Sequence, residues 1–287
     1  MTATTERLAE PPVWLGTVFD RIVCGVDGTE SSRVAVAQAV RLLGARRMVE
    51  LVSVVEGSPV PWSGALASAE LERQYEEAQR ALREARAQYP RARSLLLFGD
   101  PGPTLVEAAR DAQATLAVTG APASGRLGGI VLGSVGTHVL HRAPCSVLIA
   151  RPSADETAFP RSIVVGHDGS KGAAAAAAVA KELAHRFGAV LRILVATGGD
   201  PVQIDPLAQE KELEWSSLRP TDALATVFAE ADLLVVGSRG LRGVRALGSV
   251  SERIGHLARS SVLVVREPPG ATAADSGDED AVPDSEC

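Results

Sequence analysis

The chain has 287 residues, of which 46% are hydrophobic, enough for one large or two ordinary domains with buried cores. Only 3% are aromatic, so the cores must be built from aliphatic side chains, as in parallel sheets packed under helices. The formal charge of −6 comes from seven acidic residues after position 266, and without them 28 Asp and Glu stand against 29 Lys and Arg. Residues 1–266 are therefore close to neutral and lack the excess of basic residues typical of a nucleic-acid-binding protein.

The first half of the chain alternates between short apolar strands and helical patterns. Strands are predicted at 21–27, 48–55, 93–98, 115–120 and 145–150, and helices at 31–43, 65–89, 103–113 and 134–141. Strands separated by helices are joined by right-handed crossovers, which gives a parallel sheet covered on both faces. The prediction is therefore an α/β fold with a doubly wound, mostly parallel, five-stranded sheet.

The second half repeats the first. The strand followed by Asp27-Gly28-Thr29 returns, 141 residues later, as a strand followed by Asp168-Gly169-Ser170. The fourth strand returns with an offset of 117, and the segment 133–151 returns as 248–266 with an offset of 115. Three landmarks in the same order indicate a duplicated domain.

The shrinking offset means that the second copy has lost residues, and the loss has a visible place. After a strand predicted at 190–197, only 198–209 remain before the strand-like stretch 211–218. The long helix of the first copy is therefore expected to be missing. Its loss would expose apolar surface unless the other domain or a second chain covers it. Trp215 in this stretch is expected to serve packing.

The expected organisation has five parts: a disordered N-terminus at 1–18, a first domain at 19–152, a linker at 153–160, an abridged second domain at 161–267, and a disordered acidic tail at 268–287. Cys24 and Cys145 lie in apolar runs and are predicted to be buried free thiols. The chain shows no signal peptide and no apolar run of about 18 residues. A soluble, cytoplasmic protein without membrane association is expected.

Two features lie where open α/β sheets bind ligands, beyond the carboxyl ends of the strands. Asp27 and Asp168 each follow the opening strand of a copy, although an Asp before Gly also makes a turn that caps the next helix. Glycine-rich segments follow the fourth strands, at 120–134 and 237–249, and each ends in Gly-Ser at a helix start. Glycines let an anion approach backbone N–H groups, and a helix N-terminus favours negative charge, so both segments look like phosphate cradles.

These strands, the Asp after the first of them and the late glycine loop resemble the universal stress protein family, over residues 20–151 and 160–266. The resemblance implies an ATP-binding loop of the form G-x2-G-x9-G-(S/T). The first copy keeps this spacing but has Ala123 in place of the second glycine. The second copy reaches Gly248 after seven residues instead of nine.

The resemblance also implies site residues, with adenine near the Asp and the end of the second strand, and with ribose and phosphates along the loop. In the first copy these positions are Asp27, Val54, Gly120, Ala123, Gly133, Ser134 and Val135. In the second copy they are Asp168, Ala196, Gly237, Gly240, Gly248, Ser249 and Val250. A deletion reshapes the loop more than one Ala does, so the first copy is favoured as the binding domain.

No catalytic or metal-binding residue is assigned. The chain has no P-loop, no G-x-G-x-x-G after an opening strand and no G-x-S-x-G elbow, and the pair His138 and His141 lacks further ligands at metal-binding spacing.

Two functions stay open. One is a regulator in which ATP, with or without Mg²⁺, biases conformation or assembly, with at most slow hydrolysis; the other is a scaffold that has lost nucleotide binding. The resemblance further implies that 146–150 pairs with 262–265 as an internal pseudo-dimer, and that two chains associate as a homodimer.

Overall fold

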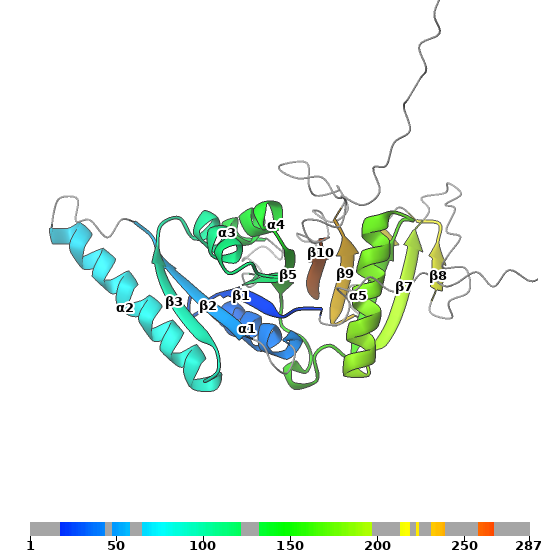
Figure 1. The fold of residues 1–287 in the computed structure, drawn as a ribbon, viewed down its shortest axis with the longest axis horizontal. Helices are drawn as coiled ribbons and strands as arrows, with labels where there is room; N and C mark the ends of the chain where they lie inside the picture. Colours follow the sequence, from blue (N-terminus) through cyan, green and yellow to red (C-terminus); the bar gives the residue numbers. More distant parts are fainter. Residues whose placement is uncertain are drawn as a thin grey trace, which may run out of the picture.

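The protein is described by a computed structural model, over residues 18–43, 48–57, 65–121, 132–196, 213–218, 222–223, 231–238 and 258–266. Within these ranges, ten strands form one sheet in the order β3-β2-β1-β4-β5-β10-β9-β6-β7-β8 (Figure 1). The segments 1–17 and 267–287 lie outside the described residues. So does 198–209, the segment in which the second copy was predicted to lack the long helix of the first. No helix in the described part is long and apolar enough to cross a membrane.

The first repeat, defined as residues 20–151, supplies half of this sheet. Its strands are β1 (Arg21–Gly25), β2 (Met48–Val55), β3 (Arg93–Phe98), β4 (Leu116–Gly120) and β5 (Ser146–Ala150), and its helices are α1 (Glu30–Leu42), α2 (Ala65–Gln88), α3 (Pro101–Asp111) and α4 (Ser134–Arg142). Neighbouring strands pair in parallel throughout, which confirms the doubly wound prediction. Helix α3 starts two residues before the predicted position, because a proline at the first helical position costs no hydrogen bond.

The second repeat, defined as residues 161–266, follows the short helix η2 (Glu156–Ala158). Its described elements are β6 (Ser162–His167), α5 (Lys171–Phe187), β7 (Val190–Ala196), β8 (Leu213–Ser216), β9 (Leu233–Gly237) and β10 (Ser261–Val265). Alanine-rich α5 is capped at its N-terminus by Ser170, whose side chain accepts the N–H of Ala173, and at its C-terminus by Gly188, which lies in the left-handed region with φ 64°. The strand order mirrors that of the first repeat.

The two repeats join along β5 and β10, which pair antiparallel. Leu148 lies opposite Leu263, and these leucines are counterparts in the repeat. The junction therefore has pseudo-two-fold symmetry. The pairing that the resemblance implied for 146–150 and 262–265 is confirmed.

Side chains at the junction follow the same symmetry. The backbone N–H of Arg151 donates to Oγ of Ser261 at 3.0 Å, and the N–H of Arg266 donates to Oγ of Ser146 at 3.1 Å. Each guanidinium then reaches a backbone carbonyl of the other repeat, that of Arg151 bonding Ser260 at 3.3 Å. Burial lowers the pKa of Arg151 to about 10. These contacts tie the repeats together across the junction.

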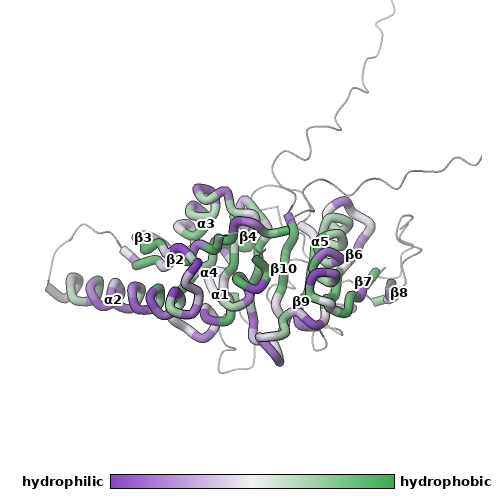
Figure 2. Tube along the Cα trace, turned by 60° about the horizontal axis from the view of Figure 1, so that its bottom comes forward, coloured by the Kyte–Doolittle hydropathy of each residue, from purple (hydrophilic) through white to green (hydrophobic). Residues whose placement is uncertain are grey.

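Helices cover both faces of the sheet (Figure 1). Helices α3 and α4 pack on one face, and α1, α2 and α5 pack on the other. Hydrophobic residues concentrate on the strands, while α2 is largely hydrophilic along its length (Figure 2). Each of the two buried clusters contains residues of both repeats, so the core continues through the junction.

Two sequence predictions about single side chains have opposite outcomes. Cys24 and Cys145 are buried free thiols, as predicted. Burial raises the pKa of Cys145 to about 12, and burial together with the carboxylate of Asp27 raises the pKa of Cys24. The packing prediction for Trp215 is wrong, because its side chain on β8 is 55% exposed.

Candidate functional site

A cavity of about 550 Å³ lies beyond the carboxyl ends of β1, β2 and β4. The strand order reverses between β1 and β4, which is where open α/β sheets bind ligands. The volume suits a small molecule. Six of the seven residues predicted for the first repeat line it: Asp27, Val54, Gly120, Gly133, Ser134 and Val135. The seventh, Ala123, lies outside the described residues.

Asp27 shapes the turn between β1 and α1. Its Oδ1 accepts the backbone N–H of Thr29 at 2.9 Å and the Thr29 hydroxyl at 2.6 Å. Thr29 Oγ1 in turn accepts the N–H of Ser32 at 3.3 Å and caps α1. Gly28 between them has φ 78°, a conformation that favours glycine. Asp27 therefore makes the turn that the sequence offered as its alternative role, and it lines the cavity as well.

Gly120 is required by packing. At the end of β4, a Cβ on Gly120 would lie 2.3 Å from the carbonyl oxygen of Ser31 at the start of α1. Its counterpart Gly237 is in the same situation, with the carbonyl oxygen of Gly172 at 2.3 Å. Both glycines thus let the first helix of their repeat approach the fourth strand. Their identity has a structural reason apart from any ligand.

The N-terminus of α4 differs from that of α1. Gly133 occupies the N-cap position of α4 and offers no side chain to bond the first-turn amides. Ser134, Val135 and Gly136 of this turn line the cavity. The first N–H groups of a helix have no partner within the helix, and they carry the positive end of its dipole. This end of α4 can therefore donate hydrogen bonds to an anion in the cavity.

The described charged side chains that line the cavity are all acidic: Asp27, Glu30 and Glu56. Glu30 is paired with Arg33, with 2.9 Å between Oε2 and Nη2. Within the described lining, the favourable potential for an anion therefore comes from backbone amides.

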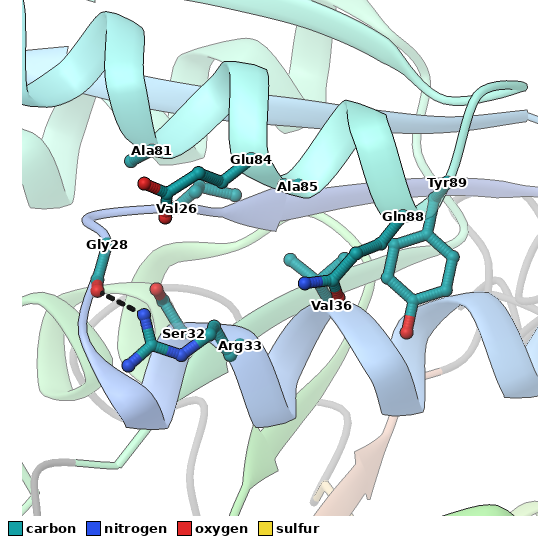
Figure 3. A pocket seen from close by; sticks show the side chains of 10 residues that line it. All are labelled: Val26, Gly28, Ser32, Arg33, Val36, Ala81, Glu84, Ala85, Gln88 and Tyr89. Atoms are coloured by element: carbon teal, nitrogen blue, oxygen red, sulfur yellow. Dashed lines mark hydrogen bonds between the residues drawn. The ribbon is translucent and has the colours of Figure 1, made fainter.

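A smaller hollow lies behind the same turn, between α1 and α2 (Figure 3). Its volume of about 20 Å³ has room for about one water molecule. Arg33 on its wall donates from Nη1 to the carbonyl oxygen of Gly28 at 2.9 Å (Figure 3). This hollow supports the turn that carries Asp27 and is too small for a ligand.

The predicted residues of the second repeat are only partly described. Asp168 is exposed and accepts the N–H of Ser170 at 3.1 Å, as Asp27 accepts that of Thr29. Ala196 is buried in the core and Gly237 ends β9. The other four predicted residues, Gly240, Gly248, Ser249 and Val250, lie outside the described residues. A common site for this set is not seen in the described part.

The cavity also contains residues that the sequence analysis did not name. Glu56 follows the end of β2, Thr119 is near the end of β4, and Pro101 and Leu105 belong to α3. A usable signal existed for Glu56, which comes directly after the end of β2, and for Pro101, which comes three residues after the end of β3, both on the ligand-binding edge of the sheet.

Sequence comparison places the chain among known proteins. A sequence model of the universal stress protein family matches residues 19–151 and 201–266. The universal stress protein Rv2623 of Mycobacterium tuberculosis is 31% identical, with 86% of this chain and 96% of the relative covered. The universal stress protein Mb2028c of Mycobacterium bovis is 32% identical over 61% of this chain and 69% of the relative.

Structural comparison agrees on the fold. The crystal structure of a universal stress protein from Archaeoglobus fulgidus superposes with a TM-score of 0.67 at 20% identity, covering 86% of this chain and 98% of that chain. Both repeats take part in a match of this extent. The chain is therefore a tandem member of the universal stress protein family.

Proposed function

We propose that the first repeat binds an adenine nucleotide, and that the protein is a stress-response regulator whose nucleotide state biases its conformation or assembly. The observation that carries this proposal is the uncapped N-terminus of α4, which opens into the cavity of about 550 Å³ beside the ends of β1 and β4. Its amides suit phosphates, and apolar Val54 and Val26 on the same cavity suit a base. The choice of adenine rests on the family resemblance.

ATP is the proposed ligand, accompanied by Mg²⁺. The described residues hold no cluster of three or more potential metal ligands. Mg²⁺ commonly binds through one or two carboxylates together with substrate phosphates. The ion would therefore be carried in with the nucleotide, and it would offset phosphate charge in a cavity whose described charged side chains are acidic. Residues 19–152 and 161–267 are the proposed domains, and the cytoplasm is the proposed location.

The test combines two measurements on the full chain. Mass spectrometry of the small molecules released by denaturation identifies what co-purifies. ATP titration then compares the wild type with Gly133→Arg, which fills the cavity beside α4, and with Gly248→Arg at the counterpart position. Saturable binding that only Gly133→Arg abolishes is the expected result. An empty protein without saturable binding at millimolar ATP contradicts the proposal.

The second candidate is a scaffold of the same fold. The observation that favours it is the exposed side chain of Trp215 on β8, with Leu218 nearby at 47% exposed. Exposed apolar residues of this size are common at protein interfaces. Analytical ultracentrifugation of the wild type and Trp215→Gln tests this surface, because self-association through it is expected to weaken in the variant, and the scaffold requires in addition that the ATP titration shows no binding.

A further inference from the structure

Helix α1 connects the cavity to the junction between the repeats. Its N-terminal end, from Thr29 to Ser32, lines the cavity. Thirteen residues at 1.5 Å each give it a length of about 20 Å. Its C-terminal half lies against the second repeat and the linker, so one rigid element contacts both places.

Gln38, in the middle of α1, is the first of these contacts. The side chain is 1% exposed, and its Oε1 accepts the hydroxyl of Ser261 on β10 at 2.8 Å. Its Nε2 donates to the carbonyl oxygen of Arg151 at 2.8 Å and to Glu156 at 3.3 Å. A buried amide that loses such partners is destabilising, so α1 and the junction are held in one arrangement. The counterpart of Gln38 in α5 is Val179, which cannot make these bonds.

The C-terminal end of α1 is the second contact. Its last carbonyls lack partners within the helix, and the guanidinium of Arg186 on α5 donates to those of Arg41, Leu42 and Leu43, with 2.8 Å to Leu42. Arg186 also stacks on Phe187, 4.8 Å from the ring centre. The positive charge lies at the favourable end of the helix dipole. The second repeat therefore supplies the C-terminal cap of a helix of the first.

We propose that the second repeat positions helix α1 and thereby the cavity of the first repeat. Ser261 of the second repeat holds α1 through Gln38, Arg186 holds its C-terminal end, and a ligand in the cavity is thereby coupled to the junction. The nucleotide part of this inference rests on the proposed function. Coupling is reciprocal, so the ligand strengthens the junction by the same factor by which the junction contacts strengthen ligand binding.

The pseudo-symmetry provides a matched pair of variants. Ser261→Ala removes the donor to Gln38 and to the carbonyl oxygen of Arg151, together with the acceptor for the Arg151 N–H, whereas Ser146→Ala removes the symmetric acceptor for Arg266. Both change one buried hydroxyl at the same junction. In the full chain, nucleotide affinity is expected to fall about fivefold in Ser261→Ala and to stay unchanged in Ser146→Ala. Equal affinities in the two variants overturn the inference.

Hydrogen exchange gives a readout that does not need a ligand. Without nucleotide, the amides of residues 33–36 in α1 are expected to exchange faster in Ser261→Ala and in Gln38→Met than in Ser146→Ala. With ATP, the wild type is expected to gain protection in β5 and β10, and Ser261→Ala to lose that gain. If the wild type binds no nucleotide, the proposed function fails, and the ligand-free comparison alone decides the positioning role: unchanged exchange in α1 overturns it.

Discussion

The two repeats share a strand order, a turn and a pair of close-packed glycines, yet they differ in what surrounds the edge of the sheet. In the first repeat, α2 covers β2 and β3, and Leu96 on β3 packs against the buried cluster that contains Ala81 and Leu82 of that helix. The strand registers make Trp215 on β8 the counterpart of Leu96, and it is 55% exposed. The same sheet position is thus partly buried under a helix in one repeat and exposed in the other.

The turns after the first strands differ less. Gly28 and Gly169 have φ 78° and 80°, and both aspartates accept the N–H two residues ahead. Arg33 reinforces the first turn through the Gly28 carbonyl, while its counterpart is Ala174. Both repeats therefore keep the same turn backbone after their first strand. The reinforcing side chains belong to the first.

The largest expected effect comes from the close-packed glycines. Gly120→Ala and Gly237→Ala each place a methyl group 2.3 Å from a carbonyl oxygen, and each is expected to lower the free energy of unfolding by about 3 kcal/mol. Urea denaturation measures both. Nucleotide titration then separates the repeats, since only Gly120→Ala also distorts the cavity wall. A loss of nucleotide affinity in Gly237→Ala as large as that in Gly120→Ala contradicts the assignment of the site to the first repeat.

The second comparison is between the partly buried Leu96 on β3 and the exposed Trp215 on β8. Leu96→Gln puts a polar group under α2 and is expected to cost about 2 kcal/mol, while Trp215→Gln changes the stability of the monomer by less than about 0.5 kcal/mol. Thermal unfolding at low protein concentration, where self-association is minimal, measures both. A large loss in Trp215→Gln would mean that this side chain is covered.

The two aspartates test the site itself. Asp27→Asn keeps an oxygen to accept the N–H of Thr29, so the turn is preserved, but it removes the charge that faces the cavity. Because a neutral amide oxygen is a weaker acceptor for the amino group of an adenine than a carboxylate is, we expect about tenfold weaker ATP binding, equivalent to about 1.4 kcal/mol, and no change in Asp168→Asn. Isothermal titration calorimetry measures both variants. Equal weakening in the two would show that both repeats bind.

Much of this architecture could be predicted because its signals are local. The strands 48–55 and 93–98 are bounded as predicted, since apolar runs between helical patterns define them. Six of the seven first-repeat site positions line the cavity, because the ends of parallel strands meet at one edge. The pairing of 146–150 with 262–265 came from the family resemblance, since periodicity alone does not say which edges pair, and the structure adds that the two strands are antiparallel.

The remaining features depend on contacts between distant parts of the chain. Nothing near Gly120 shows that Ser31 will approach it, and nothing near Trp215 shows whether a helix covers it. Gln38 reads as an ordinary polar residue in a helix, and only the fold brings it to Ser261 and Arg151. Hydropathy predicts that a face is buried, but its partner follows from topology.

The smallest effect is expected where a residue of the first repeat is replaced by its counterpart from the second. Cys24 in β1 corresponds to Val165 in β6, and both are fully buried in the same cluster of aliphatic side chains. Cys24→Val is therefore expected to change the free energy of unfolding by no more than about 0.5 kcal/mol, because that environment already accommodates a valine. Urea denaturation of this variant beside Cys24→Ser makes the measurement specific, since the serine buries a hydroxyl and is expected to cost about 1–3 kcal/mol. A loss above 2 kcal/mol in Cys24→Val would mean that the cores of the two repeats have diverged as much as their edges.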